Sequence, residues 1–221
     1  MKSKLLLLLS FITLSLNIYS RDVEVKINSS ESDAKIYQDG KLVGTGSAMI
    51  IMWFNKGVCT VEIKKTGYLV ETLELYYDKL HGKPKKEYIV TMRKDDSYEA
   101  SSSSDQANID IEVKTTKKED EAWRLISEIV TSKFDVIETS DKSTGYLRTA
   151  WTTQTFNQNT IRTRVIVKSA GTNPLRYKFK LISEYSGQNN TSIKSDELFK
   201  PWDRVLRKYE DVISELQSRL K

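Results

Sequence analysis

The sequence predicts two β-rich domains, an all-β sandwich over residues 22–93 and an α+β domain over residues 116–221. Three observations favour this division. Short runs of alternating apolar and polar residues, separated by turns that contain glycine, fill the first region. The second region begins and ends with apolar residues at helical spacing and has strand-like alternation in between. Residues 94–115 separate the two as a linker, because 94–108 have almost no apolar side chains and include four consecutive serines. A long loop inside one domain is the alternative.

The first twenty residues, 1–20, have the pattern of a secretory signal peptide. Lys2 and Lys4 form the positive start, an apolar stretch runs from Leu5 to Leu16, and the small residue Ser20 ends it. The stretch is shorter than the roughly 20 residues that a spanning helix needs, and an uncleaved membrane anchor is the alternative. No cysteine lies near its end to carry a lipid, and no later segment is apolar enough to span a membrane. We expect an exported protein, periplasmic or at the cell surface, that is not lipidated.

Within 22–93 the strands are expected in chain order. Apolar and charged side chains alternate over residues 23–27, as in a half-buried strand. Residues 34–38 lead into Asp39-Gly40, a pair that favours two-residue hairpin turns. Residues 59–63 alternate again, which places Cys59 in the core as a small hydrophobic side chain. Further strands are expected at 42–43, 49–54, 70–77 and 88–92. Short strands at this turn spacing are typical of a small β-sandwich.

The order of these parts resembles the PEGA domain. The resemblance rests on Ala34-Lys-Ile36-Tyr37 before Asp39-Gly40, then Gly44, Gly57, Val61 and Gly67-Tyr68. The family usually has Pro-Gly before its alanine and Thr-Pro after its turn, where this chain has Glu31 and Asp33, and Ser47-Ala48. The resemblance implies an accessory module of envelope and surface proteins that binds carbohydrate or other surface components and has no catalytic residues.

The second domain is expected to run helix, four strands, helix. Thr116 and Glu119 fit a capping box at the start of the first helix. Pro201 fits the first turn of the last helix, whose apolar stripe extends from Trp202 to Leu220. Strands are expected at 134–137, 146–153, 160–168 and 175–185. Hairpin-length connections predict an antiparallel sheet with both helices on one face. This layout, and the stretch from Asp141 to Trp151, is similar to the helix-grip domains of outer-membrane assembly lipoproteins.

Reactive side chains are scarce. With one His and one Cys, the chain cannot form an intramolecular disulfide or supply the usual ligands of zinc and iron–sulfur sites. His81 lies between strands with no G-x-S-x-G motif to pair with, and a buried Cys59 is not a reactive thiol. No phosphate loop, dinucleotide fingerprint or calcium loop occurs. We expect a protein that is not an enzyme and uses no cofactor and no metal, the alternative being a hydrolase with an unrecognised carboxylate pair.

The strands of the second domain alternate apolar side chains with cations. If the helices cover the apolar face, which is expected to include Leu147, Thr149 and Trp151, the cations share the open face. These are Arg148, Arg162, Arg164, Lys168, Arg176, Lys178 and Lys180, with Tyr146 nearby. Such a face could hold phosphate groups or acidic glycans. The alternative is a solvated face that keeps the protein soluble.

Trp53 is the other candidate ligand-binding residue. It lies in the run 50–54, in which both faces of a strand are apolar. A fully buried strand has this pattern, and so does a strand with one face used as a contact surface.

The charge balance indicates the class of partner. The chain carries 35 Lys plus Arg against 30 Asp plus Glu, a formal charge of +5. Without Lys2 and Lys4 of the predicted signal peptide the balance is 33 against 30, or +3, which is too small to indicate nucleic-acid binding. We expect an exported, non-enzymatic envelope protein that binds or scaffolds carbohydrate or an anionic polymer. The alternative within this class is a protein-interaction adaptor in envelope assembly that uses the apolar patch near Trp53.

Overall fold

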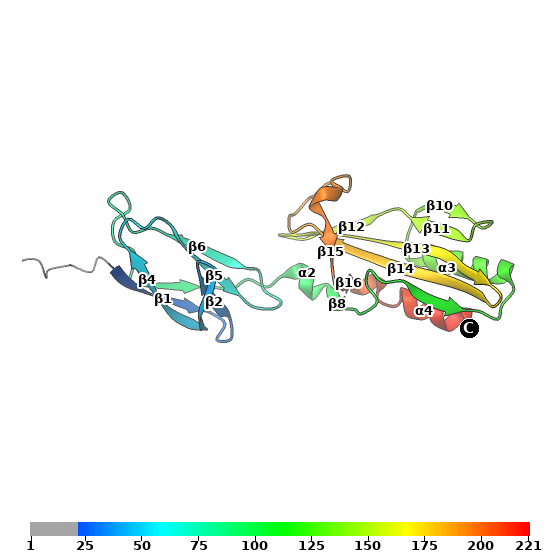
Figure 1. Cartoon of the computed structure of the whole chain (residues 1–221), viewed down its shortest axis with the longest axis horizontal. Helices are drawn as coiled ribbons and strands as arrows, with labels where there is room; N and C mark the ends of the chain where they lie inside the picture. Colours follow the sequence, from blue (N-terminus) through cyan, green and yellow to red (C-terminus); the bar gives the residue numbers. More distant parts are fainter. Residues whose placement is uncertain (1–21) are drawn as a thin grey trace, which may run out of the picture. The chain divides into compact units, whose positions relative to one another are not determined.

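A computed structural model describes residues 22–221, which divide into two compact units with the boundary in the chain between Arg93 and Lys94. The chain is mostly β, with few helices (Figure 1). The predicted signal peptide lies outside the described residues. Over 22–221, no helix is long and apolar enough to cross a membrane.

Unit 1, up to Arg93, is built from strands. They are β1 (Asp22–Ser29), β2 (Lys35–Gln38), β3 (Lys41–Thr45), β4 (Ser47–Trp53), β5 (Cys59–Lys64), β6 (Glu71–Leu75) and β7 (Glu87–Val90). They follow the order β6-β5-β2-β3-β4-β1-β7, in which β1 and β7 are parallel and the other neighbours are antiparallel. The pairing of β3 with β4 is limited to Thr45 and Ser47, so the sheet divides there into two halves.

The two halves of this sheet enclose one hydrophobic core. Ile36 and Ile63 from one half and Val25 and Ile50 from the other are fully buried in the same cluster. Cys59 is buried in this cluster too, as the alternation of its strand predicts. The apolar alternation therefore predicted the inward face of these strands correctly, because one-sided burial imposes a period of two.

The serine-rich segment 94–115 is part of unit 2, so the predicted linker is wrong. Asp95 caps α2 (Asp96–Glu99) by accepting hydrogen bonds from two backbone N–H groups. β8 (Ser101–Ser103) pairs with β16 (Arg204–Leu206), and Ser101 is fully buried with its Oγ accepting from Arg204 Nε. β9 (Ile111–Lys114) joins the main sheet beside β14. Serine lacks apolar bulk, but its backbone pairs normally and its hydroxyl finds partners, so the segment is ordered.

The main sheet of unit 2 is built around one long antiparallel hairpin (Figure 1). The hairpin consists of β13 (Thr160–Thr172) and β14 (Leu175–Tyr185). β10 (Ile137–Asp141), β11 (Tyr146–Thr149) and β12 (Thr152–Thr155) lie on the β13 side, and β9 and β15 (Lys200–Pro201) pair with β14.

Both helices pack on one face of this sheet. α3 (Glu119–Lys133) and α4 (Val212–Leu220) share one core with the inward residues of the hairpin, represented by Ile126, Leu216, Val165 and Phe179. α4 begins eleven residues after the predicted start at Pro201, because residues 200–201 and 204–206 pair as β15 and β16 and a 3-10 turn (Arg207–Tyr209) follows.

The predicted capping box at the start of α3 is also wrong. The N-cap is Lys118, which makes no side-chain cap hydrogen bond, and Thr116 Oγ1 donates to the carbonyl of Lys221. Three acidic residues in the first turn of α3, including Glu119, favour the helix start by their interaction with the helix dipole.

Candidate functional site

The face of the unit 2 sheet opposite the helices carries the candidate site. Along β13 the side chains of Ile161, Val165 and Val167 are fully buried in the core, while Lys168 is exposed on the other side. β14 follows the same alternation, with Tyr177 and Phe179 buried and Lys178 exposed. Lys168 and Lys178 therefore lie on the face of the sheet opposite the helices.

Lys168 and Lys178 are register partners on β13 and β14. Tyr146 on β11 is the register partner of Lys168 on the other side, so the three residues form one row across the sheet. Neither lysine forms an ion pair with any described residue. Glu112 of β9 is the next register partner of Lys178, but its carboxylate pairs with Arg176. Like charges directly opposite each other destabilise a sheet, so the row favours an added anion.

A tight turn joins β10 to β11 just before Tyr146, whose register partner on β10 is Asp141. Asp141 accepts hydrogen bonds through its carboxylate from Ser143 and Thr144, and these bonds hold the pKa of its carboxyl below the usual value. Gly145 has a φ of 64°, and a Cβ there would lie 2.6 Å from Cβ of Ser169. Only glycine fits this close approach to β13 without strain.

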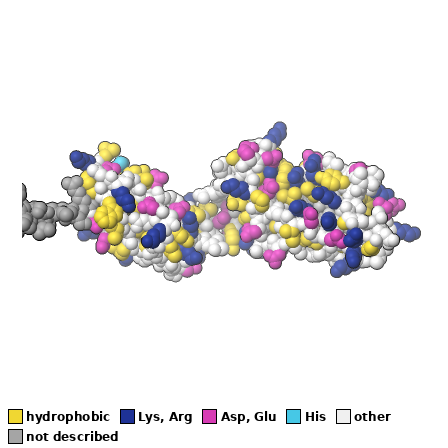
Figure 2. All heavy atoms as spheres, in the orientation of Figure 1, with side chains coloured by type: hydrophobic (Ala, Val, Ile, Leu, Met, Phe, Trp, Pro, Cys, Tyr) yellow, Lys and Arg dark blue, Asp and Glu magenta, His cyan; other side chains and the backbone are white. Residues whose placement is uncertain are grey.

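Four of the seven predicted cations are balanced by acidic residues, so the face is not uniformly positive. On the face of unit 2 visible in Figure 2, Lys and Arg side chains are interspersed with Asp and Glu. The ion pairs are Arg148 with Glu138, Arg162 with Glu184 and Asp196, Arg176 with Glu112, and Lys180 with Asp110. Among the predicted cations, Arg164, Lys168 and Lys178 form no ion pair within the described part of the chain.

Arg162 is buried and makes structural contacts within unit 2. The prediction that it lies on an open surface is wrong. It is 4% exposed, and its guanidinium lies between the rings of Trp151 and Phe199, 4.2 and 4.1 Å from their centroids. It also donates to Glu184, Asp196 and the carbonyl of Ile193. The segment after β14 therefore folds back over this end of the sheet and removes Arg162 from the candidate site.

Trp151 lies on the cation face, and the prediction that it shares the apolar face is wrong. The register partner of Arg148 is Ile166, whereas that of Thr152 is Thr163, so the β11–β12 side has one extra residue. Such a bulge moves the following side chains to the opposite face. The guanidinium of Arg164 consequently stacks on Trp151 as well, with its Cζ 4.0 Å from the centroid of the Trp151 ring.

Arg164 is desolvated by this packing. Burial and, secondarily, the neighbouring charge of Arg148 lower the pKa of its guanidinium. Its Nε is buried without a hydrogen-bond partner. Arg164 thus lies on the same face as Lys168, farther along β13, and forms no ion pair within the described residues, although the charges of Glu184 and Glu138 also act on it.

The candidate residue of unit 1, Trp53, is 52% exposed. It forms an apolar stripe on β4 with Met49 and Ile51, while Ile50 and Met52 point into the core. The strand is therefore not buried on both faces, and the use of its exposed face as a contact surface stays a prediction. The sequence alone could not decide this, because a strand buried on both faces has the same pattern.

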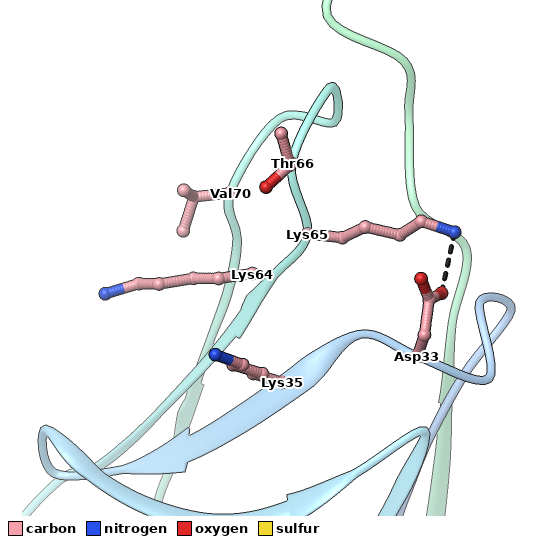
Figure 3. Close-up of a pocket in the computed structure, with 6 residues that line it drawn as sticks. All are labelled: Asp33, Lys35, Lys64, Lys65, Thr66 and Val70. Atoms are coloured by element: carbon pink, nitrogen blue, oxygen red, sulfur yellow. Dashed lines mark ion pairs between the residues drawn. The ribbon is translucent and has the colours of Figure 1, made fainter.

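A groove of about 430 Å³ lies at the edge of unit 1 (Figure 3). Lys35 and Lys64, which are register partners, extend into it, and Lys65 turns toward Asp33. Lys65 Nζ lies 2.7 Å from Asp33 and 2.5 Å from Glu31, and these hydrogen bonds lower the pKa of both carboxyls. Lys64 pairs with Glu62 in addition. The groove is largely neutralised and is a weaker anion site than the row on unit 2.

Comparison with models of known protein families and with characterised proteins finds no match to this chain. The resemblance of residues 22–93 to the PEGA domain therefore stays a prediction.

Proposed function

We propose that this is an exported, non-catalytic envelope protein that binds anionic polymers on the open sheet face of unit 2. The observation that carries the proposal is the row Tyr146–Lys168–Lys178, in which two opposed lysines lack ion-pair partners among the described residues. An anion placed between the two ammonium groups would offset their repulsion and gain two charge-assisted hydrogen bonds.

The shape of this surface favours a polymer over a small molecule. The row crosses a sheet face that is built from long strands, and Arg164 adds a further unpaired cation toward Trp151. A repeating chain of phosphates or uronic acids can bind several such cations at once, which strengthens binding without a deep cavity. Tyr146 adds an aromatic ring beside Lys168 against which a sugar face can pack.

The predicted class of the two domains agrees with this proposal. The resemblance of unit 1 to PEGA modules implies a surface-binding accessory domain, and the predicted signal peptide implies export. The proposed function is therefore binding to an anionic polysaccharide or another anionic polymer of the envelope.

Binding of the chain from Arg21 onward to fluorescent polymers tests the proposal. Inorganic polyphosphate and polygalacturonate represent phosphate and carboxylate polymers, and neutral dextran is the matched control. We expect binding to both anionic polymers that weakens steadily as salt is added, because salt screens exposed charges. Equal binding to dextran, or binding that salt does not change, would contradict the proposal.

A further inference from the structure

An ordered loop of unit 1 presents a large apolar side chain to solvent. Leu80 is 87% exposed at the tip of the loop between β6 and β7. Asp78 accepts hydrogen bonds at Oδ1 from the backbone N–H groups of Leu80 and His81, and its carbonyl accepts from Gly82 N. Gly82 supports the reversal with a φ of 72°. The loop is therefore held in a defined turn with Leu80 outermost.

The neighbouring turn between β4 and β5 adds exposed apolar area at the same end of unit 1. Asn55 N donates to the carbonyl of Tyr77 at 2.8 Å, which joins this turn to the base of the Leu80 loop. Val58 is 47% exposed beside Trp53 at the end of β4. In the loop itself, the ring of Tyr76 stacks on His81 with centroids 4.6 Å apart.

Exposed lysines lie in both of these segments. Lys79, Lys83, Lys85 and Lys86 lie in the Leu80 loop, and Lys56 lies in the β4–β5 turn; all are exposed, and none forms an ion pair with any residue in 22–221. The one acidic residue of the loop is Asp78, which pairs with His81 and caps the turn. The loop is therefore strongly basic, and its charge is not balanced locally.

We infer that this end of unit 1 binds the surface of an anionic lipid bilayer, with Leu80 inserting between headgroups. An apolar tip in a loop with several unpaired lysines is complementary to a negatively charged interface over an apolar interior. Trp53 and Tyr76 suit the headgroup level, where aromatic side chains concentrate. The chain also enters unit 1 here, since Asp22, the first described residue, is the register partner of Trp53. The predicted export segment therefore precedes this end.

Vesicle sedimentation with the chain from Arg21 onward tests the inference. The vesicles contain phosphatidylcholine alone, or phosphatidylcholine with an equal amount of phosphatidylglycerol. We expect binding only to the anionic vesicles. The Leu80→Ser variant should bind at least about tenfold more weakly, a loss of about 1.4 kcal/mol, because the apolar side chain that would leave water is removed. Each Lys→Ala change at Lys83 or Lys85 should cost about fivefold, from roughly 1 kcal/mol per lysine at such a surface.

Val70→Ser is the matched control, because Val70 is 49% exposed at the opposite end of β6. This control, and the double variant K168A/K178A in unit 2, should bind vesicles within about twofold of the unmodified chain, an energy of about 0.4 kcal/mol. Equal binding by the Leu80→Ser variant and the unmodified chain would overturn the inference. So would binding to envelope membranes that is lost after protease treatment, combined with no binding to pure lipid, because a protein would then be the partner.

Discussion

Lys168 and Lys178 face each other across the central hairpin of unit 2, and neither has a carboxylate partner among the described residues. Every other cation predicted for that face, except Arg164, pairs with an acidic residue that lies on a neighbouring strand, just before β9, or in the segment after β14. The sheet thus neutralises most of its charge and leaves one opposed pair uncompensated. Such a pair costs stability in the free protein and offers a site to an anion.

Reversal of one charge in this pair should increase stability. Lys168→Glu replaces a repulsive cross-strand pair with an attractive one, and neither register partner of position 168 is acidic. We expect the free energy of unfolding to rise by roughly 0.2–1 kcal/mol. Urea denaturation at low salt measures this, and the gain should shrink when salt is added. A loss of stability at low salt would contradict the assigned geometry.

The same substitution should weaken binding to polyphosphate, because one of the two cations is replaced by an anion. Stability and binding are therefore expected to change in opposite directions. A variant that is both less stable and weaker in binding would point to structural damage instead.

Truncation of Arg162 should destabilise unit 2 strongly. Arg162→Ala leaves Glu184 partly buried without its cation and removes the stacking between Trp151 and Phe199. Loss of one partner of a buried ion pair costs on the order of 3 kcal/mol. Arg219→Ala, which breaks exposed ion pairs of α4, is the control and should cost less than about 1 kcal/mol. Similar losses in the two variants, measured by urea denaturation, would be inconsistent with the buried role of Arg162.

Alanine substitutions at two glycines with positive φ should distinguish the cost of backbone strain from the cost of steric overlap. Gly145 and Gly187 have φ of 64° and 71°, but only at Gly145 would a Cβ overlap another residue, Ser169. Gly187→Ala should cost about 1–2 kcal/mol from backbone strain alone. Gly145→Ala should cost about 1–3 kcal/mol more, because the turn must move away from β13. Thermal denaturation compares the two, and equal losses would show that the overlap relaxes freely.

Acid should weaken unit 1 through the Lys65 cluster. Because the pKa values of Glu31 and Asp33 are lowered in the folded state, the unfolded chain binds more protons at mildly acidic pH. The stabilisation is therefore present at neutral pH and is lost as pH falls from about 5 through the lowered pKa values. In Lys65→Met, the free energy of unfolding should depend less steeply on pH over this range. An unchanged slope would contradict the assignment.

The alternation of side chains was the most informative signal in the sequence. It predicted the inward faces of β1, β5, β13 and β14, because a strand covered on one face must bury every second residue. The predicted strand 146–153 failed at Trp151, because one extra residue in a bulge reverses the face without changing the composition. The predicted start of the last helix was also wrong, because Trp202, Val205 and Leu206 fit a helical stripe but residues 204–206 pair as β16.

The candidate site was predictable only in part. The sequence indicated which cations share a face, but not which acidic residues approach them, because Glu112 and Asp110 come from the segment predicted to be a linker. Leu80 was missed because one apolar residue in a basic loop carries no periodic signal. Its exposure is evident only from the turn built around Asp78.

The most direct test of the central claim is the fluorescence anisotropy of labelled polyphosphate, titrated with two double variants of unit 2. K168A/K178A removes the unpaired row, while K194A/K200A removes two exposed lysines that also lack ion pairs within the described chain. Both variants lose the same charge. We predict that K168A/K178A binds at least about tenfold more weakly, a loss of about 1.4 kcal/mol, and that K194A/K200A stays within about twofold. Equal weakening in both variants would show that net charge, not the opposed lysine pair, determines binding.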